Sequence, residues 1–192
     1  MSDYKADRTK VSVDVAGGVI EGEFNGKLNR TDEVIKRRVT LHDGLSSCVR
    51  HEPMIPPSAT GMLLDVDALT ERYESQRLPG QRDLMILFTV RFSRTDTFHA
   101  QFETARSFAW TKLCVERRLA VVLVQHQPGL SGYVEGKPHV HMLIFGRELH
   151  DSNFSRLHRS AEGPAEGHPR CRMGGLARKT CLTPSLLPPF SP

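Results

Sequence analysis

Two histidines separated by one residue lie within an apolar stretch, residues 138–145, and they are the residues of this sequence best suited to chemistry. In a β-strand, side chains two residues apart project from the same face, about 7 Å apart along the strand, so His139 and His141 can direct both imidazoles toward one metal ion. A third histidine, His126, ends the preceding apolar run and can face the same way across a hairpin. Three neutral imidazoles with open positions left over describe a catalytic metal site, because a structural site normally closes with four ligands.

A pair of histidines at this spacing also arises by chance, and a single histidine in a strand is usually a partly exposed polar residue. The metal interpretation is favoured here because two polar side chains inside an apolar strand cost free energy unless they have a function. The third histidine is also only one hairpin away. The remaining histidines have no partner at ligand spacing and are expected to be solvated: His42, His51, His99, His150, His158 and His168.

The sequence of residues 84–145 predicts the strands and the helix that must position these histidines. Residues 84–92 and 119–125 are nearly continuous apolar runs rich in strand-forming residues, which predicts two strands buried on both faces. Between them, apolar residues recur at spacings of three or four over residues 98–113, which predicts an amphipathic helix of about five turns. A turn-rich stretch then leads to a last strand over residues 139–145.

This β-α-β-β order predicts an α+β sandwich with helices on one face. The first two strands can lie parallel through a right-handed crossover, and the last two form an antiparallel hairpin, with the His-x-His strand at the centre. Residues 80–150 are the expected metal-binding core, and residues 1–79 are an N-terminal extension. Residues 151–192 are a low-complexity tail that is expected to be disordered, with a helix beginning over residues 148–158.

The N-terminal extension carries weaker patterns. Short valine-containing runs on either side of Gly17-Gly18 predict a hairpin that turns at the glycines. Residues 25–60 are polar and interrupted by prolines, so they are expected to form a loop or linker. A short helix is predicted over residues 66–76, with Asp65 as its N-cap.

The net charge argues against nucleic-acid binding by bulk electrostatics. Residues 154–192 hold six basic and two acidic residues, which accounts for the whole formal charge of +4 and leaves residues 1–153 neutral. A domain that binds phosphates by charge alone usually shows a basic excess, so a case for DNA must come from a site. The four cysteines are scattered, with no CxxC pair and no signal peptide, and no apolar run approaches the roughly 20 residues of a membrane span. We therefore expect a soluble, cytoplasmic protein with free thiols and no membrane partner.

Two neighbouring segments resemble the metal-binding motif of the HUH endonuclease superfamily, which includes rolling-circle replication initiators and conjugative relaxases. They are Val121-Val122-Leu123-Val124-Gln125-His126 and Gly136-Lys137-Pro138-His139-Val140-His141-Met142-Leu143-Ile144. Members of the superfamily carry a Gly-x-Pro-His-hydrophobic-His-hydrophobic pattern on a central strand, preceded by a strand bearing a His or Glu ligand. The strand over residues 87–93 and the helix after it also match the family order. The resemblance covers about residues 84–146 and implies a ferredoxin-like, HUH-type sandwich.

The resemblance implies a metal-dependent DNA nickase that acts in plasmid, phage or mobile-element replication. A divalent ion, Mg²⁺ or Mn²⁺, held by His126, His139 and His141 would polarise the scissile phosphate, while a tyrosine attacks phosphorus and forms a covalent phosphotyrosine. In relaxases the third ligand is a histidine, as His126 is here, whereas replication initiators often carry a Glu at the position of Val124. The implied partners are single-stranded DNA at a replication or transfer origin, with bases stacked on aromatic side chains, and host replication proteins.

The nucleophile is the point at which this chain departs from the family pattern. Replication initiators place a tyrosine after the His motif, but no tyrosine follows His141, and the chain contains only Tyr4, Tyr73 and Tyr133. Relaxases place their tyrosine before the motif, which makes Tyr73 a candidate. Tyr133, in the loop between the last two strands, is a second candidate in a place that the family does not use. The third alternative is a chain truncated or frame-shifted after about residue 150, which would be a non-catalytic, DNA-binding remnant.

Overall fold

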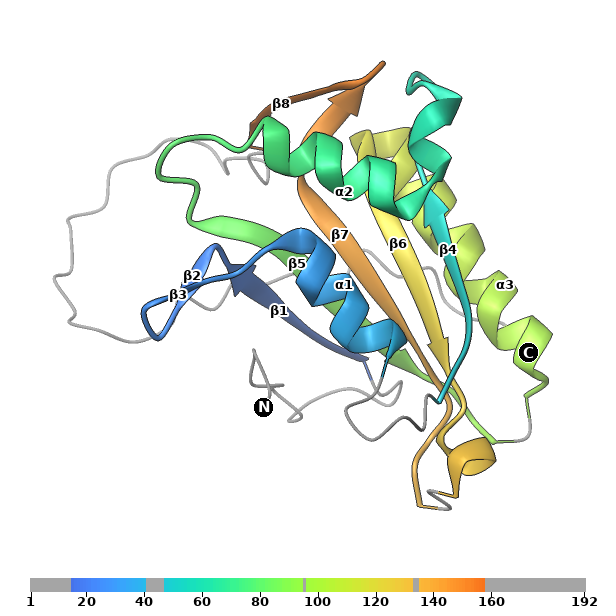
Figure 1. The fold of residues 1–192 in the computed structure, drawn as a ribbon. Helices are drawn as coiled ribbons and strands as arrows, with labels where there is room; N and C mark the ends of the chain where they lie inside the picture. Colours follow the sequence, from blue (N-terminus) through green and yellow to red (C-terminus); the bar gives the residue numbers. More distant parts are fainter. Residues whose placement is uncertain (1–14, 41–46, 95, 133–134, 158–192) are drawn as a thin grey trace, which may run out of the picture. The chain divides into compact units, whose positions relative to one another are not determined.

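A six-stranded antiparallel sheet is the largest feature of the fold (Figure 1). The structure is a computed structural model that describes residues 15–40, 47–94, 96–132 and 135–157. The strands are β1 (Val15–Glu21), β2 (Glu23–Phe24), β3 (Lys27–Leu28), β4 (Cys48–Met54), β5 (Asp83–Arg91), β6 (Leu119–His126), β7 (His139–His150) and β8 (Asn153–Leu157). The helices are α1 (Thr31–Val39), α2 (Val66–Ser75) and α3 (Phe98–Phe108), with the short 3₁₀ helices η1 (Gly61–Leu64) and η3 (Pro128–Ser131) and the π-helix η2 (Ala109–Val115).

The strand order β1-β5-β7-β6-β4 places β7 at the centre of the sheet, and β8 pairs with β7 as well. Both β5 and β6 run antiparallel to β7, so they are parallel to each other, and α3 with η2 forms the crossover between them. β6 and β7 form the antiparallel hairpin. This topology confirms the predicted α+β class and the central position of the His-x-His strand.

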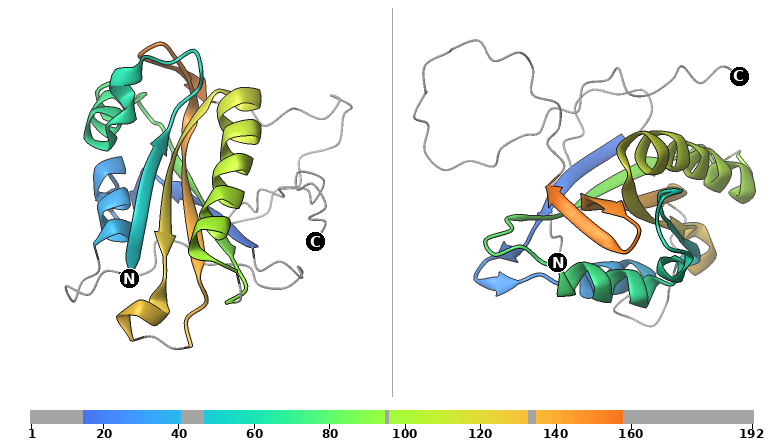
Figure 2. Two further views of the ribbon diagram at one scale, coloured as in Figure 1. Left: turned by 90° about the vertical axis from the view of Figure 1, so that its right-hand side faces the viewer. Right: turned by 90° about the horizontal axis from the view of Figure 1, so that it is seen from above.

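The two faces of the sheet are covered by different helices. On β7, Val140 and Met142 pack in the cluster beneath α3 and η2, whereas Leu143 packs in the cluster beneath α1 and α2. Figure 2 shows α1 and α2 on one side of the sheet and α3 on the other. Because side chains alternate along a strand, His139 and His141 share the face of Leu143.

The prediction of helices on one face therefore holds only within residues 80–150, where α3 is the long helix. The opposite face is covered by α1 and α2, which precede that segment in the sequence. The physical reason is the composition of the central strands, since every residue of β6 is buried. A strand that is apolar on both faces needs cover on both sides of the sheet.

β1 is one continuous strand, so the hairpin predicted to turn at Gly17-Gly18 is wrong. The strand pairs along its length with β5, and Gly17 lies opposite Phe88. A Cβ atom at Gly17 would lie 3.0 Å from the Phe88 ring, so glycine serves close packing here and not a turn. The turn lies instead at Asn25-Gly26, where both residues have positive φ, between β2 and β3.

The segment predicted as a loop or linker, residues 25–60, contains both α1 and β4. No side chain caps α1 locally; its first residue, Thr31, donates from its backbone N–H and its hydroxyl to Oε1 of Glu74 on α2, at 2.7 and 2.8 Å. The helix therefore depends on a contact 43 residues away, which no local pattern indicates. β4 tolerates Pro53 because it is an edge strand, where a missing N–H does not interrupt a ladder on its open side.

The two helices that were predicted from caps and spacing are present. Asp65 accepts a hydrogen bond from the backbone N–H of Ala68 at 2.8 Å and caps α2. Thr97 accepts from the backbone N–H of Ala100 at 3.2 Å and caps α3. The predicted helix of about five turns is split, because α3 passes directly into the π-helix η2.

β7 continues well beyond residue 145 and β8 returns along it, so strands stand where the start of a helix was predicted. Arg147, a residue that is 2% exposed, holds this end of the sheet together through its guanidinium group. It donates to the backbone carbonyls of Gln76, Phe154 and Ser155, and thereby connects β7 to the end of α2 and to β8. The rest of the predicted tail lies outside the described residues.

Candidate metal centre

Three imidazoles meet where β6 ends and β7 begins. His126 is the direct antiparallel partner of His139, and His141 lies two residues further along β7 on the same face. The ring centroids are 4.8 to 5.0 Å apart. One ligand nitrogen from each ring lies within 4.8 Å of the others. The structure thus brings together the three histidines that the sequence analysis singled out.

Each ring is held by one hydrogen bond at its Nδ1 atom, between 2.8 and 2.9 Å long. The pairs are His126 with the hydroxyl of Ser47, His139 with the backbone carbonyl of Lys137, and His141 with the hydroxyl of Thr89. Because a carbonyl can only accept, His139 carries its proton on Nδ1 and presents a lone pair at Nε2. The hydroxyls of Ser47 and Thr89 can also accept a proton from Nδ1, so His126 and His141 can adopt the same tautomer as His139. Such polar partners orient histidines that bind metals.

The Nε2 atom of His126 is the observation that points to a ligand. It is buried and has no hydrogen-bond partner among the residues that the structure describes. An unsatisfied buried polar atom costs about 1–3 kcal/mol, and a metal ion bound at this nitrogen would remove that cost. The donor set fits a divalent ion with open coordination positions. Nitrogen donors favour a transition metal such as Mn²⁺ over Mg²⁺, which prefers oxygen ligands.

Burial keeps the three histidines neutral. For His126, which is 5% exposed, burial and then the nearby charge of His139 lower the pKa to about 4. Burial also lowers the pKa of His139, and it lowers the pKa of His141 well below its ordinary value. Neutral imidazole is the form that binds a metal ion, so all three ligands are available at neutral pH without loss of a proton.

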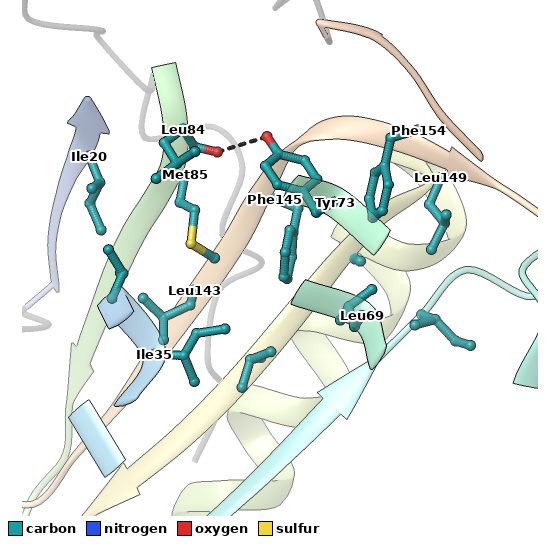
Figure 3. Packing of buried hydrophobic residues seen from close by; sticks show 14 of the residues in the cluster. Ile20, Ile35, Leu69, Tyr73, Leu84, Met85, Leu143, Phe145, Leu149 and Phe154 are labelled. Atoms are coloured by element: carbon teal, nitrogen blue, oxygen red, sulfur yellow. Dashed lines mark hydrogen bonds between the residues drawn. The ribbon is translucent and has the colours of Figure 1, made fainter. Parts of the chain in front are cut away.

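Tyr73, the first candidate nucleophile, lies in the hydrophobic core. Its side chain is 0% exposed, and its hydroxyl donates to the carbonyl of Leu84 at 2.8 Å (Figure 3). The hydroxyl also accepts from Nε2 of Gln81 at 2.8 Å. The ring packs edge-on against Phe145 and Phe154, with centroids 4.9 and 4.8 Å away. Burial raises the pKa of the hydroxyl to about 12. These contacts use the hydroxyl for packing and oppose its ionisation.

Tyr73 is also remote from the three histidines. Its hydroxyl lies beside Gly146, where a Cβ atom would be 3.7 Å away. Gly146 is five residues along β7 from His141, which corresponds to about 16 Å in a strand. The structure therefore argues against Tyr73 as the nucleophile, because α2 places it at the other end of the sheet. Tyr133, the second candidate, lies outside the described residues.

Two residues of the site were missed by the sequence analysis, and they differ in how visible they were. Thr89 carried a signal in the sequence, because it is a hydroxyl residue within an apolar strand. In the structure it is 1% exposed and pairs directly with His141. Ser47 carried none, since it stands in the segment predicted as a linker. Among the histidines expected to be solvated, those within the described residues are exposed: His51, His99 and His150.

The fold and the site together define an α+β protein with a three-histidine centre on two central antiparallel strands. A solved structure described as the molecular basis of vancomycin resistance transfer in Staphylococcus aureus is similar to this chain, with a TM-score of 0.61 and 16% sequence identity, covering 79% of each chain. Similarity at this level of identity shows a shared fold. No family model and no curated protein matches the chain. Within the described residues, none of the helices has the length and apolar character to cross a membrane.

Proposed function

We propose that this protein is a metal-dependent nickase of single-stranded DNA that acts in the transfer or replication of a mobile element. The observation that carries the proposal is the three-histidine centre, in which each Nδ1 has a polar partner and the buried Nε2 of His126 has none within the described residues. The similarity to a structure described by the transfer of vancomycin resistance supports it, because the superfamily that the His-x-His strand resembles includes relaxases, which act in the conjugative transfer of DNA. The resemblance of the His-x-His strand to the HUH motif points the same way.

In the proposed reaction the three neutral histidines His126, His139 and His141 would hold a divalent ion. The bound ion would supply positive charge where negative charge builds up on the phosphate oxygens. A tyrosine oxygen forms a bond to phosphorus, the bond from phosphorus to one sugar oxygen breaks, and that oxygen leaves with the proton that the tyrosine hydroxyl gives up. Joining of the strand is the reverse of these events.

We propose a tyrosine other than Tyr73 as the nucleophile. The chain contains three tyrosines, and the hydroxyl of Tyr73 is buried with both a donor and an acceptor partner. Tyr133 and Tyr4 are then the candidates that this chain offers. Both lie outside the described residues.

A second candidate function is a DNA-binding remnant that no longer cleaves. The burial of Tyr73, the one tyrosine within the described residues, favours it. Such a protein would still bind a metal ion and single-stranded DNA, but it would form no covalent bond to the strand.

A cleavage assay distinguishes the two functions. The full chain is incubated with a library of single-stranded oligonucleotides and Mn²⁺, and a covalent adduct is sought on a denaturing gel. The nickase should form an adduct that is absent with EDTA, retained in Tyr73→Phe and lost in Tyr4→Phe or Tyr133→Phe. DNA binding that depends on Mn²⁺ without any adduct would support the remnant. A chain that shows no response to Mn²⁺ would refute both functions.

A further inference from the structure

His126 is flanked along the chain by two buried glutamines, Gln125 and Gln127, whose side chains reach the opposite face of the sheet. Gln125 pairs directly with Val140 of β7, which packs beneath α3. Its Nε2 atom donates to the backbone carbonyl of Phe98, the first residue of α3, at 2.7 Å. Because side chains alternate along a strand, the imidazole lies on the side of α1 and α2 while the preceding residue is fastened to α3.

Gln127 makes a second contact with the start of α3. Its Nε2 atom donates to Oε1 of Gln101, another buried glutamine near the beginning of that helix, at 2.9 Å. Gln101 in turn donates from Nε2 to the carbonyls of Ser93 and Asp96, at 3.2 and 2.9 Å, in the connection between β5 and α3. Amide hydrogen bonds therefore join the end of β6 both to α3 and to the segment that precedes it.

Gln127 also fixes the hydroxyl that contacts His126. Its backbone N–H donates to the carbonyl of Ser47 at 2.9 Å, and the hydroxyl of Ser47 lies 2.8 Å from Nδ1 of His126. Since a peptide bond joins His126 to Gln127, these contacts close a ring through Ser47 that sets the orientation of the imidazole. The Nε2 atom, which has no partner among the described residues, is then the nitrogen left for an ion.

Packing alone does not explain amides at these two positions. Every residue of β6 is buried, and the core cluster beneath α3 consists of apolar side chains, so an apolar residue could be buried there without a polar cost. A buried amide is favourable only when it is hydrogen-bonded, and a satisfied network selects one arrangement of the backbone. His126 needs that restraint because the pairing of β6 with β7 ends at this residue.

We propose that Gln125 and Gln127 are positioning residues that hold His126, through the backbone and through Ser47, in the orientation that binds the metal ion. This inference rests on the proposed function and adds to it the residues that pre-organise the buried ligand of its metal centre. The glutamines do not contact the ion. They restrict the freedom that His126 would otherwise lose on binding it, and so raise the affinity without adding a ligand.

The test replaces each glutamine by methionine in the full chain, because methionine has a similar length and no amide. Gln125→Met and Gln127→Met remove the hydrogen bonds to α3. Gln81→Met is the matched control, since Gln81 is also buried and its Nε2 donates to the hydroxyl of Tyr73, at the other end of the sheet. Ser47→Ala removes the hydroxyl beside His126, whereas Ser47→Thr retains one.

Three quantities are measured for each protein. A thermal melt without metal gives the Tm, and calorimetry gives the affinity for Mn²⁺ at a temperature at which all variants are folded. Nitrogen NMR of the metal-free protein shows which imidazole nitrogen of His126 carries the proton, with its signal assigned by its loss in His126→Asn. If Gln127→Met does not fold, the pair Ser47→Ala and Ser47→Thr tests the same path.

Stability and metal affinity should separate. All three methionine variants should have a lower Tm, because each loses a buried hydrogen bond. Only Gln125→Met and Gln127→Met should also bind Mn²⁺ about tenfold more weakly, as expected for residues that orient a metal ligand, and Gln81→Met should match the wild type. Ser47→Ala should lose at least as much affinity, and Ser47→Thr should keep most of it. The proton of His126 should lie on Nδ1 in the wild type and be shared with Nε2 in Ser47→Ala.

Four results would overturn the positioning role. Wild-type affinity for Mn²⁺ in both Gln125→Met and Gln127→Met would do so and leave the nickase proposal standing. An equal loss of affinity in Gln81→Met would show that stability, and not the orientation of His126, governs binding. A proton that stays on Nδ1 in Ser47→Ala would show that the hydroxyl does not set the imidazole. A wild-type chain that binds no Mn²⁺ would refute the proposed function, and the positioning role with it.

Discussion

The metal-free protein should lose stability as the pH falls from 6.5 to about 4, and His126 should cause a measurable part of that loss. Its pKa is about 4 in the folded protein, against an ordinary value of 6.5 in the unfolded chain. Between these values the unfolded chain binds a proton that the folded chain does not, so the free energy of unfolding falls with the pH. Above pH 6.5 the residue makes no difference, and below pH 4 the loss is complete. The two pKa values correspond to a loss of about 2 kcal/mol by pH 5 and about 3 kcal/mol by pH 4.

His126→Asn isolates this contribution, because an amide can still reach the hydroxyl of Ser47 but does not titrate. Urea unfolding followed by circular dichroism, in EDTA and at several pH values from 7 to 4, gives the free energy of unfolding of both proteins. The stability advantage of the wild type over the variant should shrink by about 2 kcal/mol between pH 7 and pH 5. His99→Asn, an exposed position on α3, should follow the wild type at every pH. A difference between wild type and His126→Asn that does not change with pH would refute the reasoning.

Other changes give further expected outcomes. Replacing both His139 and His141 by alanine should abolish the rise in Tm that Mn²⁺ causes in a thermal melt. For the wild type, Mn²⁺ at a hundredfold excess over Kd should stabilise the fold by about 2.7 kcal/mol. A rise in Tm that remains in the double variant would mean that the ion binds elsewhere. Tyr73→Phe removes the donor to Leu84 and should lower the free energy of unfolding by about 1–2 kcal/mol while leaving cleavage unchanged. Loss of cleavage at unchanged stability would restore Tyr73 as the nucleophile. Arg147→Met leaves three carbonyls without their donor and should cost about 3 kcal/mol or more in urea unfolding, and a change below about 1 kcal/mol would contradict that role.

The centre of the fold could be predicted because its signals are local. The apolar runs of β5, β6 and β7 mark strands buried on both faces, and the alternation around His139 and His141 shows which residues share a face. The hairpin between β6 and β7 then places His126 opposite His139, as the structure shows. Three residues of the candidate site therefore followed from spacing alone, together with the class of the fold.

The parts that could not be predicted depend on contacts distant in the sequence. α1 begins where Glu74 accepts from Thr31, so no capping residue precedes the helix. Gly17 looks like a turn residue in the sequence, but it is glycine because Phe88 packs against it. Tyr73 has the sequence environment of a surface helix, and only the packing against Phe145 and Phe154 shows that its hydroxyl is buried.

The position of β7 has a consequence for how the candidate metal centre would bind and release an ion. The strand has hydrogen-bonded partners on both sides, and its far end is fastened by Arg147. Amide hydrogens of such a strand exchange with solvent only through the largest unfolding events, so those of His139 and His141 should be among the slowest in the protein. The imidazoles of His139 and His141, by contrast, lie near the end of the hairpin and are partly exposed, whereas that of His126 is buried. We therefore expect that chelation removes an ion bound here without unfolding β7, and that the stripped protein binds the ion again with no refolding step.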